Sequence, residues 1–190
     1  LDKIKRITYS TSHPNNMTDD LIELHGTNSK LMSCLHLPVQ SGSNKILKLM
    51  NRKHTREFYF EIIDKLRKHK SNIALSSDFI VGFPEEDDRD FQETMDLIHH
   101  VGFMNSYSFK YSPRPGTPAA DREQIPIKVQ DDRLKIMQTT LDQQQIDFNK
   151  KFLSKRLDVL ISSSGKFKGQ VKGKSEFNQS VAIPGNPNII

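Results

Sequence analysis

The sequence has little of what disulfide-rich, metal-binding and membrane proteins require. It contains one cysteine, Cys34, and no tryptophan in 190 residues. One thiol cannot form an internal disulfide or hold a metal cluster alone, so we expect a reducing cytoplasm and interpret Cys34 as a core residue. No apolar run approaches the roughly 20 residues that span a bilayer, and no signal peptide is visible, so we expect no membrane partner.

Motifs of several enzyme classes are also absent. The sequence shows no nucleophile elbow, no P-loop and no metal-spaced pair of His or Cys residues. Its acidic run, EEDDRD at residues 85–90, stands where a helix is expected to begin, and the helix dipole favours carboxylates there. The run therefore predicts helix capping.

The positive charge is unevenly distributed along the chain. The net charge is +5, and residues 150–174 hold eight of the 28 lysines and arginines but one of the 23 acidic residues, Asp158. The basic surplus thus belongs to the C-terminal quarter. Such asymmetry favours a polyanionic partner, most simply a nucleic acid.

Apolar periodicity predicts alternating strands and helices in the first two thirds of the chain. The expected strands cover residues 3–9, 33–39, 73–83 and 105–111. The expected helices begin at Thr18, Asn44, Thr55 and Asp87 or Asp88. One apolar stripe is expected to cover Phe58, Tyr59, Ile62, Ile63 and Leu66. This order predicts an α/β fold with a parallel sheet covered by helices.

A change of period separates the C-terminal part. A long helix is expected from Pro126 to about Lys151, and after it apolar residues alternate with polar ones. We expect strands near residues 157–161, 166–172 and 177–183, which are too few for a closed barrel. The predicted domains are 1–125, a linking helix at 126–152, and a β module at 153–190.

All four strands of the α/β part are followed by polar or Gly/Pro-rich segments, STSHP, QSGS, VGFP and SPRPGTP. The carboxyl ends of parallel strands lie along one rim, so these segments predict a ligand site. Gly82 there either lets a flat ligand approach the backbone or forms a bulge. Arg114, between two prolines, either binds an anion or is simply exposed.

Other polar residues of this rim also have two interpretations. His13 either hydrogen-bonds a ligand or belongs to a turn. Gln40 and Ser41 either bind a sugar or carboxylate or lie beside a helix cap. Asp78 stands in mid-strand, where Asp is disfavoured, so it is either paired or faces a polar lumen.

The lysines of the β module share one parity. In a single extended strand one face would carry Lys166, Lys168, Lys172 and Lys174, and the other Phe167, Gly169 and Val171. A basic stripe on a small β barrel suits a phosphate backbone. The alternative is a solvated lysine face.

Three motifs in order, LHLPVQSGS, SSDFIVGFP and YSFKYSPRPGTPA, resemble the radical S-adenosylmethionine methylthiotransferases. The similarity covers essentially the whole chain and is closest to the MiaB type, which modifies an isopentenylated adenosine beside the tRNA anticodon. The sister type RimO, which modifies a ribosomal protein, typically has acidic residues at the positions of Arg114 and Pro115. The resemblance therefore favours the tRNA branch.

The resemblance implies the C-terminal part of a partial (β/α)6 barrel, followed by a truncated TRAM domain, an RNA-binding β barrel. The cofactor, S-adenosylmethionine, is expected at Ser12, His13, Gln40, Ser41, Gly42, Asp78, Val81 and Gly82. The substrate side is expected at Tyr107, Lys110 and Arg114. The tRNA is expected at Lys166, Lys168, Lys172 and Lys174.

The chain departs from the family in its cysteines. The family holds [4Fe–4S] clusters on a CxxxCxxC motif and three further cysteines, and none of these is present. We therefore expect a C-terminal fragment, inactive alone, whose missing N-terminal half belongs either to a longer product or to a separate chain. The alternatives are an RNA-binding module without catalysis and a degenerate split-gene remnant. PEED (84–87) also replaces the usual Pro-Gly-Glu-Thr, which could shift that loop.

Overall fold

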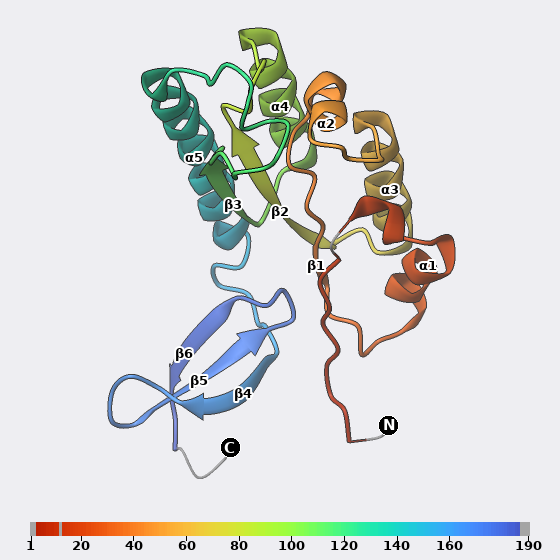
Figure 1. Ribbon diagram of the computed structural model, residues 1–190. Helices are drawn as coiled ribbons and strands as arrows, with labels where there is room; N and C mark the ends of the chain where they lie inside the picture. Colours follow the sequence, from red (N-terminus) through yellow and green to blue (C-terminus); the bar gives the residue numbers. More distant parts are fainter. Residues whose placement is uncertain (1–2, 12, 187–190) are drawn as a thin grey trace.

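The computed structural model describes residues 3–11 and 13–186, which form one parallel and one antiparallel sheet (Figure 1). The parallel sheet has the order β1-β2-β3, with β1 at Cys34–His36, β2 at Ala74–Val81 and β3 at Asn105–Lys110. Its helical elements are η1 (Pro14–Asn16), α1 (Asp19–Thr27), α2 (Asn44–Leu49), α3 (Arg56–His69) and α4 (Asp88–Val101). The α/β fold class is confirmed.

β2 is the central strand and pairs with both neighbours. Its pairing with β3 runs from Ser76 opposite Asn105 to Val81 opposite Lys110. β1 is shorter than expected because the ladder is interrupted after Leu37: Val39 N–H donates to the Ser77 hydroxyl over 3.0 Å in place of a strand carbonyl. Pairing resumes at Gln40, whose N–H donates to Asp78 O over 3.0 Å.

The strand expected at residues 3–9 does not form, and that prediction was wrong. The segment runs alongside β1 but makes only isolated parallel bridges, Ile7 to Leu31 and Ser10 to His36. Most of its described residues are exposed or half-buried. Its side chains therefore bury too little apolar surface to hold a continuous ladder.

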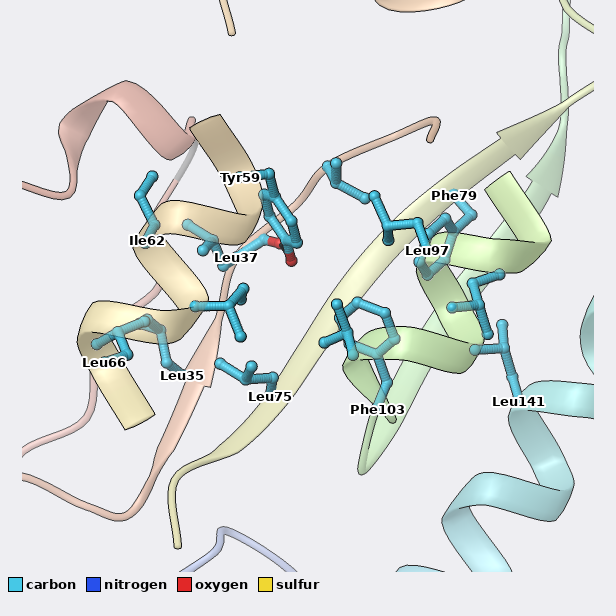
Figure 2. Packing of buried hydrophobic residues seen from close by; sticks show 14 of the residues in the cluster. Leu35, Leu37, Tyr59, Ile62, Leu66, Leu75, Phe79, Leu97, Phe103 and Leu141 are labelled. Atoms are coloured by element: carbon cyan, nitrogen blue, oxygen red, sulfur yellow. Dashed lines mark hydrogen bonds between the residues drawn. The ribbon is translucent and has the colours of Figure 1, made fainter. Parts of the chain in front are cut away.

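The core lies between the parallel sheet and its helices (Figure 2). Leu35 and Leu37 from β1 and the following segment meet Tyr59 of α3, whose hydroxyl donates to Leu37 O over 2.9 Å. Phe79 and Phe103 pack edge to face with centroids 5.4 Å apart. The stripe expected on α3 is buried except at Phe58, which is exposed because it lies off the face toward β1.

The helix starts follow the local capping chemistry. Ser43 accepts from Ile46 N–H and caps α2, and Thr55 accepts from Phe58 N–H and caps α3. Asp87 and Asp90 form a reciprocal capping box at α4. Asp87 and Asp90 of the acidic run therefore cap α4, as the position of the run predicted, whereas Glu85 and Glu86 precede the helix.

The C-terminal part comprises α5 (Ile127–Lys150) and an antiparallel sheet of β4 (Val159–Ser164), β5 (Gln170–Ser175) and β6 (Ser180–Pro184). β5 begins later than expected, because Gly169 turns the chain with a φ of 78°. The single lysine face was therefore a wrong prediction. Lys166 and Lys168 lie in the turn before β5, whereas Lys172 and Lys174 lie on the strand itself.

The same turn also changes the expected core of the β module. Val171 is buried as predicted, but Phe167 is 65% exposed at the turn. Phe177 takes the core position instead and packs against Phe148 and Phe152 with ring centroids 5.5 and 4.9 Å away. This aromatic cluster joins the β module to the end of α5. Among the described residues no helix is both long and apolar enough to cross a membrane.

We predict that Phe177→Ala destabilises the protein and that Phe167→Ala hardly does. Phe177 is 4% exposed, so its truncation leaves a cavity worth roughly 3–5 kcal/mol of unfolding free energy. The matched control, Phe167, loses little buried area and should change it by less than about 0.5 kcal/mol. Urea unfolding followed by circular dichroism measures both, and equal effects would contradict this core assignment.

Candidate ligand cleft at the strand ends

A cleft of about 1200 Å³ opens at the carboxyl ends of the three parallel strands. Its walls come from the loop before η1, the end of α2 and the segments after β2 and β3. It is lined by His13, Gln40, Leu49, Met50, Asn51, Arg52, Lys53, Asp78, Ile80, Phe83, Phe109, Lys110, Tyr111, Ser112, Arg114, Thr117, Pro118, Ala119 and Arg122. Five of the residues singled out from the sequence meet here, namely His13, Gln40, Asp78, Lys110 and Arg114.

Other expected site residues lie behind the cleft wall. Ser41 is buried, and its hydroxyl hydrogen-bonds with the Thr94 hydroxyl at 3.2 Å. Gly42 donates its N–H to the same oxygen over 2.9 Å, and a Cβ on Gly42 would collide with the α4 backbone. Ser41 and Gly42 therefore hold α4 against the turn after β1.

The remaining residues expected in the site do not line this cleft. Val81 is a fully buried core side chain, and Gly82 faces Gln130, whose Cγ lies 2.4 Å from where a Cβ on Gly82 would be. Tyr107 lies outside this cleft, in a second one described below. Ser12 lies outside the described residues.

Asp78 places a carboxylate on the cleft floor. Its Oδ2 lies 3.5 Å from His36 Nε2, and His36 Nδ1 is hydrogen-bonded with the Ser76 hydroxyl at 2.9 Å. Both Asp78 and His36 remain partly exposed. This acceptor-rich floor can receive hydroxyl or N–H donors of a ligand.

Arg52 gives the opposite wall a fixed positive charge. It follows α2 and is half-buried, and burial lowers its pKa while the nearby Asp78 carboxylate opposes that shift. Sequence reasoning missed Arg52. The available signal was its sequence position, since Arg52 comes shortly after α2, the short helix that begins directly after QSGS.

Two histidines meet beside this wall. The rings of His13 and His54 contact edge to face at 4.8 Å, with His13 Nε2 3.4 Å from His54 Nδ1. His54 is 4% exposed, and its Nε2 has no hydrogen-bond partner among the described residues. Burial, then the charges of His13 and Arg52, lower the pKa of His54 to about 4, so the ring is neutral at pH 7.

A buried ion pair fixes the loop after β2. Glu86 Oε1 accepts from Gly82 N–H over 2.9 Å and from Arg133 Nη1 of α5 over 2.8 Å. Arg133 Nη2 also donates to Asp88 Oδ1. Because Phe83 of the cleft wall lies between Gly82 and Glu86, this network sets the shape of the cleft from behind.

The PEED sequence fits this loop at the cost of an unusual backbone conformation. Glu85 has a φ of 69°, in the left-handed region that favours glycine. Its carboxylate pairs with Arg122 Nη1 at 2.9 Å. Glu85 stands at the glycine position of Pro-Gly-Glu-Thr and adopts a left-handed backbone conformation that glycine adopts without strain.

We predict that stability falls as the pH is lowered from about 6.5 to about 4. The pKa values of His54 and His25 are both near 4 in the folded chain, against 6.5 unperturbed, so the unfolded chain binds protons first across this range. Each pKa shift corresponds to about 3 kcal/mol of unfolding free energy at neutral pH. This contribution is lost progressively as the pH falls through the range, and no further loss occurs below the pKa of the folded chain.

Urea unfolding at a series of pH values tests this account of His54. His54→Gln should remove about half of the loss between pH 6.5 and 4, with His25 responsible for the rest, whereas His69→Gln, at an exposed position of α3, should leave the loss unchanged. A pH dependence unaltered by His54→Gln would show that His54 is not buried uncharged.

The sequence is similar to known proteins over nearly its whole length. The family model for the radical SAM superfamily matches residues 1–98. Proteins named tRNA-2-methylthio-N(6)-dimethylallyladenosine synthase are 56% identical over 189 residues in Rickettsia prowazekii (strain Madrid E) and 57% over 183 residues in Orientia tsutsugamushi (strain Ikeda). The matches cover 99% and 96% of this chain but 42% and 41% of those proteins, so the chain spans about two fifths of their length.

A solved structure shows a similar fold. The archaeal Elp3 of Methanocaldococcus infernus, lacking its N-terminus, superimposes with a TM-score of 0.51 at 12% identity. The match covers 92% of this chain and 56% of that one. Since the family model covers more than half of the residues, this chain belongs to the radical SAM superfamily.

Proposed function

We propose that the chain is the C-terminal, ligand-holding part of a tRNA methylthiotransferase. In this proposal the whole enzyme adds a methylthio group to C2 of N6-isopentenyladenosine next to the anticodon. The observation that carries it is the 56% identity, over nearly the whole chain, to a relative named for that modification. The cleft at the strand ends supports it, since open α/β folds bind ligands there.

S-adenosylmethionine fits the donors and acceptors of the cleft. Asp78 and Gln40 supply a carboxylate and an amide for ribose hydroxyls, and Arg52 supplies a cation for the carboxylate of the methionine part. Ser41, Gly42, Val81 and Gly82 shape the wall from behind. When bound, the cofactor supplies the methyl group and, in the intact family, the radical chemistry.

The residues of this chain do not fit an iron–sulfur cluster. Such clusters need several thiolates, whereas the sequence has Cys34 alone, which is buried. The described residues also contain no group of three His, Cys, Asp or Glu side chains placed to hold a metal. We propose that the cluster ligands belong to the part of the longer protein outside this chain, or to a second chain, and that this chain alone is inactive.

The exposed side chains of β3 support the same proposal. Tyr107 and Phe109 of β3 are exposed although they belong to the parallel sheet. We propose that the sheet is part of a partial (β/α)6 barrel and that the antiparallel sheet is a truncated TRAM domain. We also propose domain boundaries at residue 125, before the linking helix, and at residue 152, before the β module.

We predict that the chain binds S-adenosylmethionine and that Asp78→Asn and Arg52→Gln each weaken binding roughly tenfold, by removing a charge-assisted contact. Isothermal titration calorimetry with millimolar cofactor measures this, and Arg89→Gln, at an exposed position of α4, is the matched control. Wild-type affinity in both cleft variants would place the cofactor elsewhere. Binding would also argue against the alternative of a non-catalytic RNA-binding module.

We also predict that the β module contacts tRNA phosphates. Lys166 and Lys168 extend from the turn and Lys172 from β5, whereas Lys174 Nζ is engaged with the Ser180 hydroxyl at 2.9 Å. Changing Lys166, Lys168 and Lys172 to Glu should weaken tRNA binding and reduce the slope of log affinity against log salt by about 0.9 per lost phosphate contact. Filter binding at several salt concentrations measures the slope, and an unchanged slope would contradict the assignment.

A further inference from the structure

A second cleft, of about 900 Å³, lies between the parallel sheet and the β module. Its lining includes His36, Ser76, Asn105 and Tyr107 from the parallel sheet, Gln145 and Asn149 from α5, and Lys174 and Asn178–Ser180 from the β module. It adjoins the first cleft, because Tyr107 pairs in register with Asp78 and His36 lies between the two sites.

Carboxamides dominate the polar lining of this second cleft. They are Asn105, Gln145, Asn149, Asn178 and Gln179. Gln145 Nε2 donates to Asn105 Oδ1 over 3.2 Å, and Gln179 Nε2 donates to Asn149 Oδ1. Each amide has two donors and an acceptor with two lone pairs, so these bonds leave hydrogen-bonding positions for a ligand. Adjacent donors and acceptors of this kind match the edges of nucleobases.

The charged and aromatic side chains of the lining indicate which class of ligand the second cleft can bind. Among the described residues the lining has no carboxylate and a single cation, Lys174, whose ammonium bonds with Asn178 O and Ser180 Oγ. A metal ion would therefore find no matching charge, and the one ammonium is already bonded to two neutral acceptors. Tyr107 is 55% exposed and offers an aromatic face, on which an unstacked base can lie.

We propose that this second cleft binds one unpaired nucleobase of the RNA. The inference rests on the proposed tRNA function and adds a base-reading site to it. A single-stranded segment can contact Phe109 of the first cleft and Tyr107 together, since residues two apart on β3 share one face of the sheet and lie about 7 Å apart.

Gln145→Met tests the proposal, because it keeps the size of the side chain and removes its amide. The matched control is Gln143→Met, at an exposed position of the same helix. The probes are a fluorescein-labelled anticodon stem-loop RNA and versions in which each loop base is removed in turn. Fluorescence anisotropy with the full chain, at several salt concentrations, gives affinity and salt slope.

Gln145→Met should bind the RNA roughly tenfold more weakly than the unaltered chain. Its salt slope should be unchanged, because the slope depends on phosphate contacts and the amide contacts a base. Removal of one particular base should weaken the unaltered chain but not the variant. Affinity equal to that of Gln143→Met, or equal losses for every abasic RNA, would overturn the base site.

Tyr107→Leu provides a second variant at an exposed position, and it should also lose affinity through lost stacking. Salt-dependent binding that neither Gln145→Met nor Tyr107→Leu alters would refute the base site and leave the proposed function intact. No binding of the stem-loop by the unaltered chain would instead refute the RNA function itself.

Discussion

The parallel pairing of β2 with β1 and β3 is the constraint on which the rest of the structure depends. It brings the carboxyl ends of three strands to one rim, so groups far apart in the sequence, such as Gln40, Asp78 and Lys110, line one cleft. The same pairing sets Asp78 beside Tyr107 and so joins the first cleft to the second. Both proposed sites follow from the register of one central strand.

Helix α5 supports this arrangement from outside the sheet. Its Arg133 is buried against Glu86, which in turn holds Gly82 N–H, and its far end carries the aromatic cluster that anchors the β module. Breaking such a buried pair leaves an uncompensated charge, so the network is costly to disturb. Helix α5 therefore contacts the loop after β2, which lines the first cleft, and also supplies residues that line the second cleft.

Local chemistry made much of the fold predictable from the sequence. The helix starts at Thr55 and Asp87 need only neighbouring backbone groups, and they were confirmed. The segment 3–9 has a strand-like pattern, but pairing depends on tertiary contacts that its exposed residues do not supply. The four lysines do not form a single face, because residues of one parity share a face only within one continuous strand. Gly169 turns the chain between Lys168 and Lys172, so the four lysines do not lie on one strand.

The cleft was predictable in outline and less so in detail. The order of strands and helices indicated that His13 and Gln40 meet at one rim, the resemblance added Asp78, and all three line the same cleft. Periodicity could not show that Ser41 turns toward Thr94 or that Arg52 comes back to the rim, because both depend on how α2 and α4 pack.

The most direct test of the central claim is hydrogen–deuterium exchange of the chain with and without millimolar S-adenosylhomocysteine, which keeps the adenosine and the amino-acid parts of the cofactor. The account predicts slower exchange in residues 40–53, 78–83 and 110–119, which form the first cleft. Protection confined to β4–β6, or no protection anywhere, would contradict the assignment of this cleft to the cofactor.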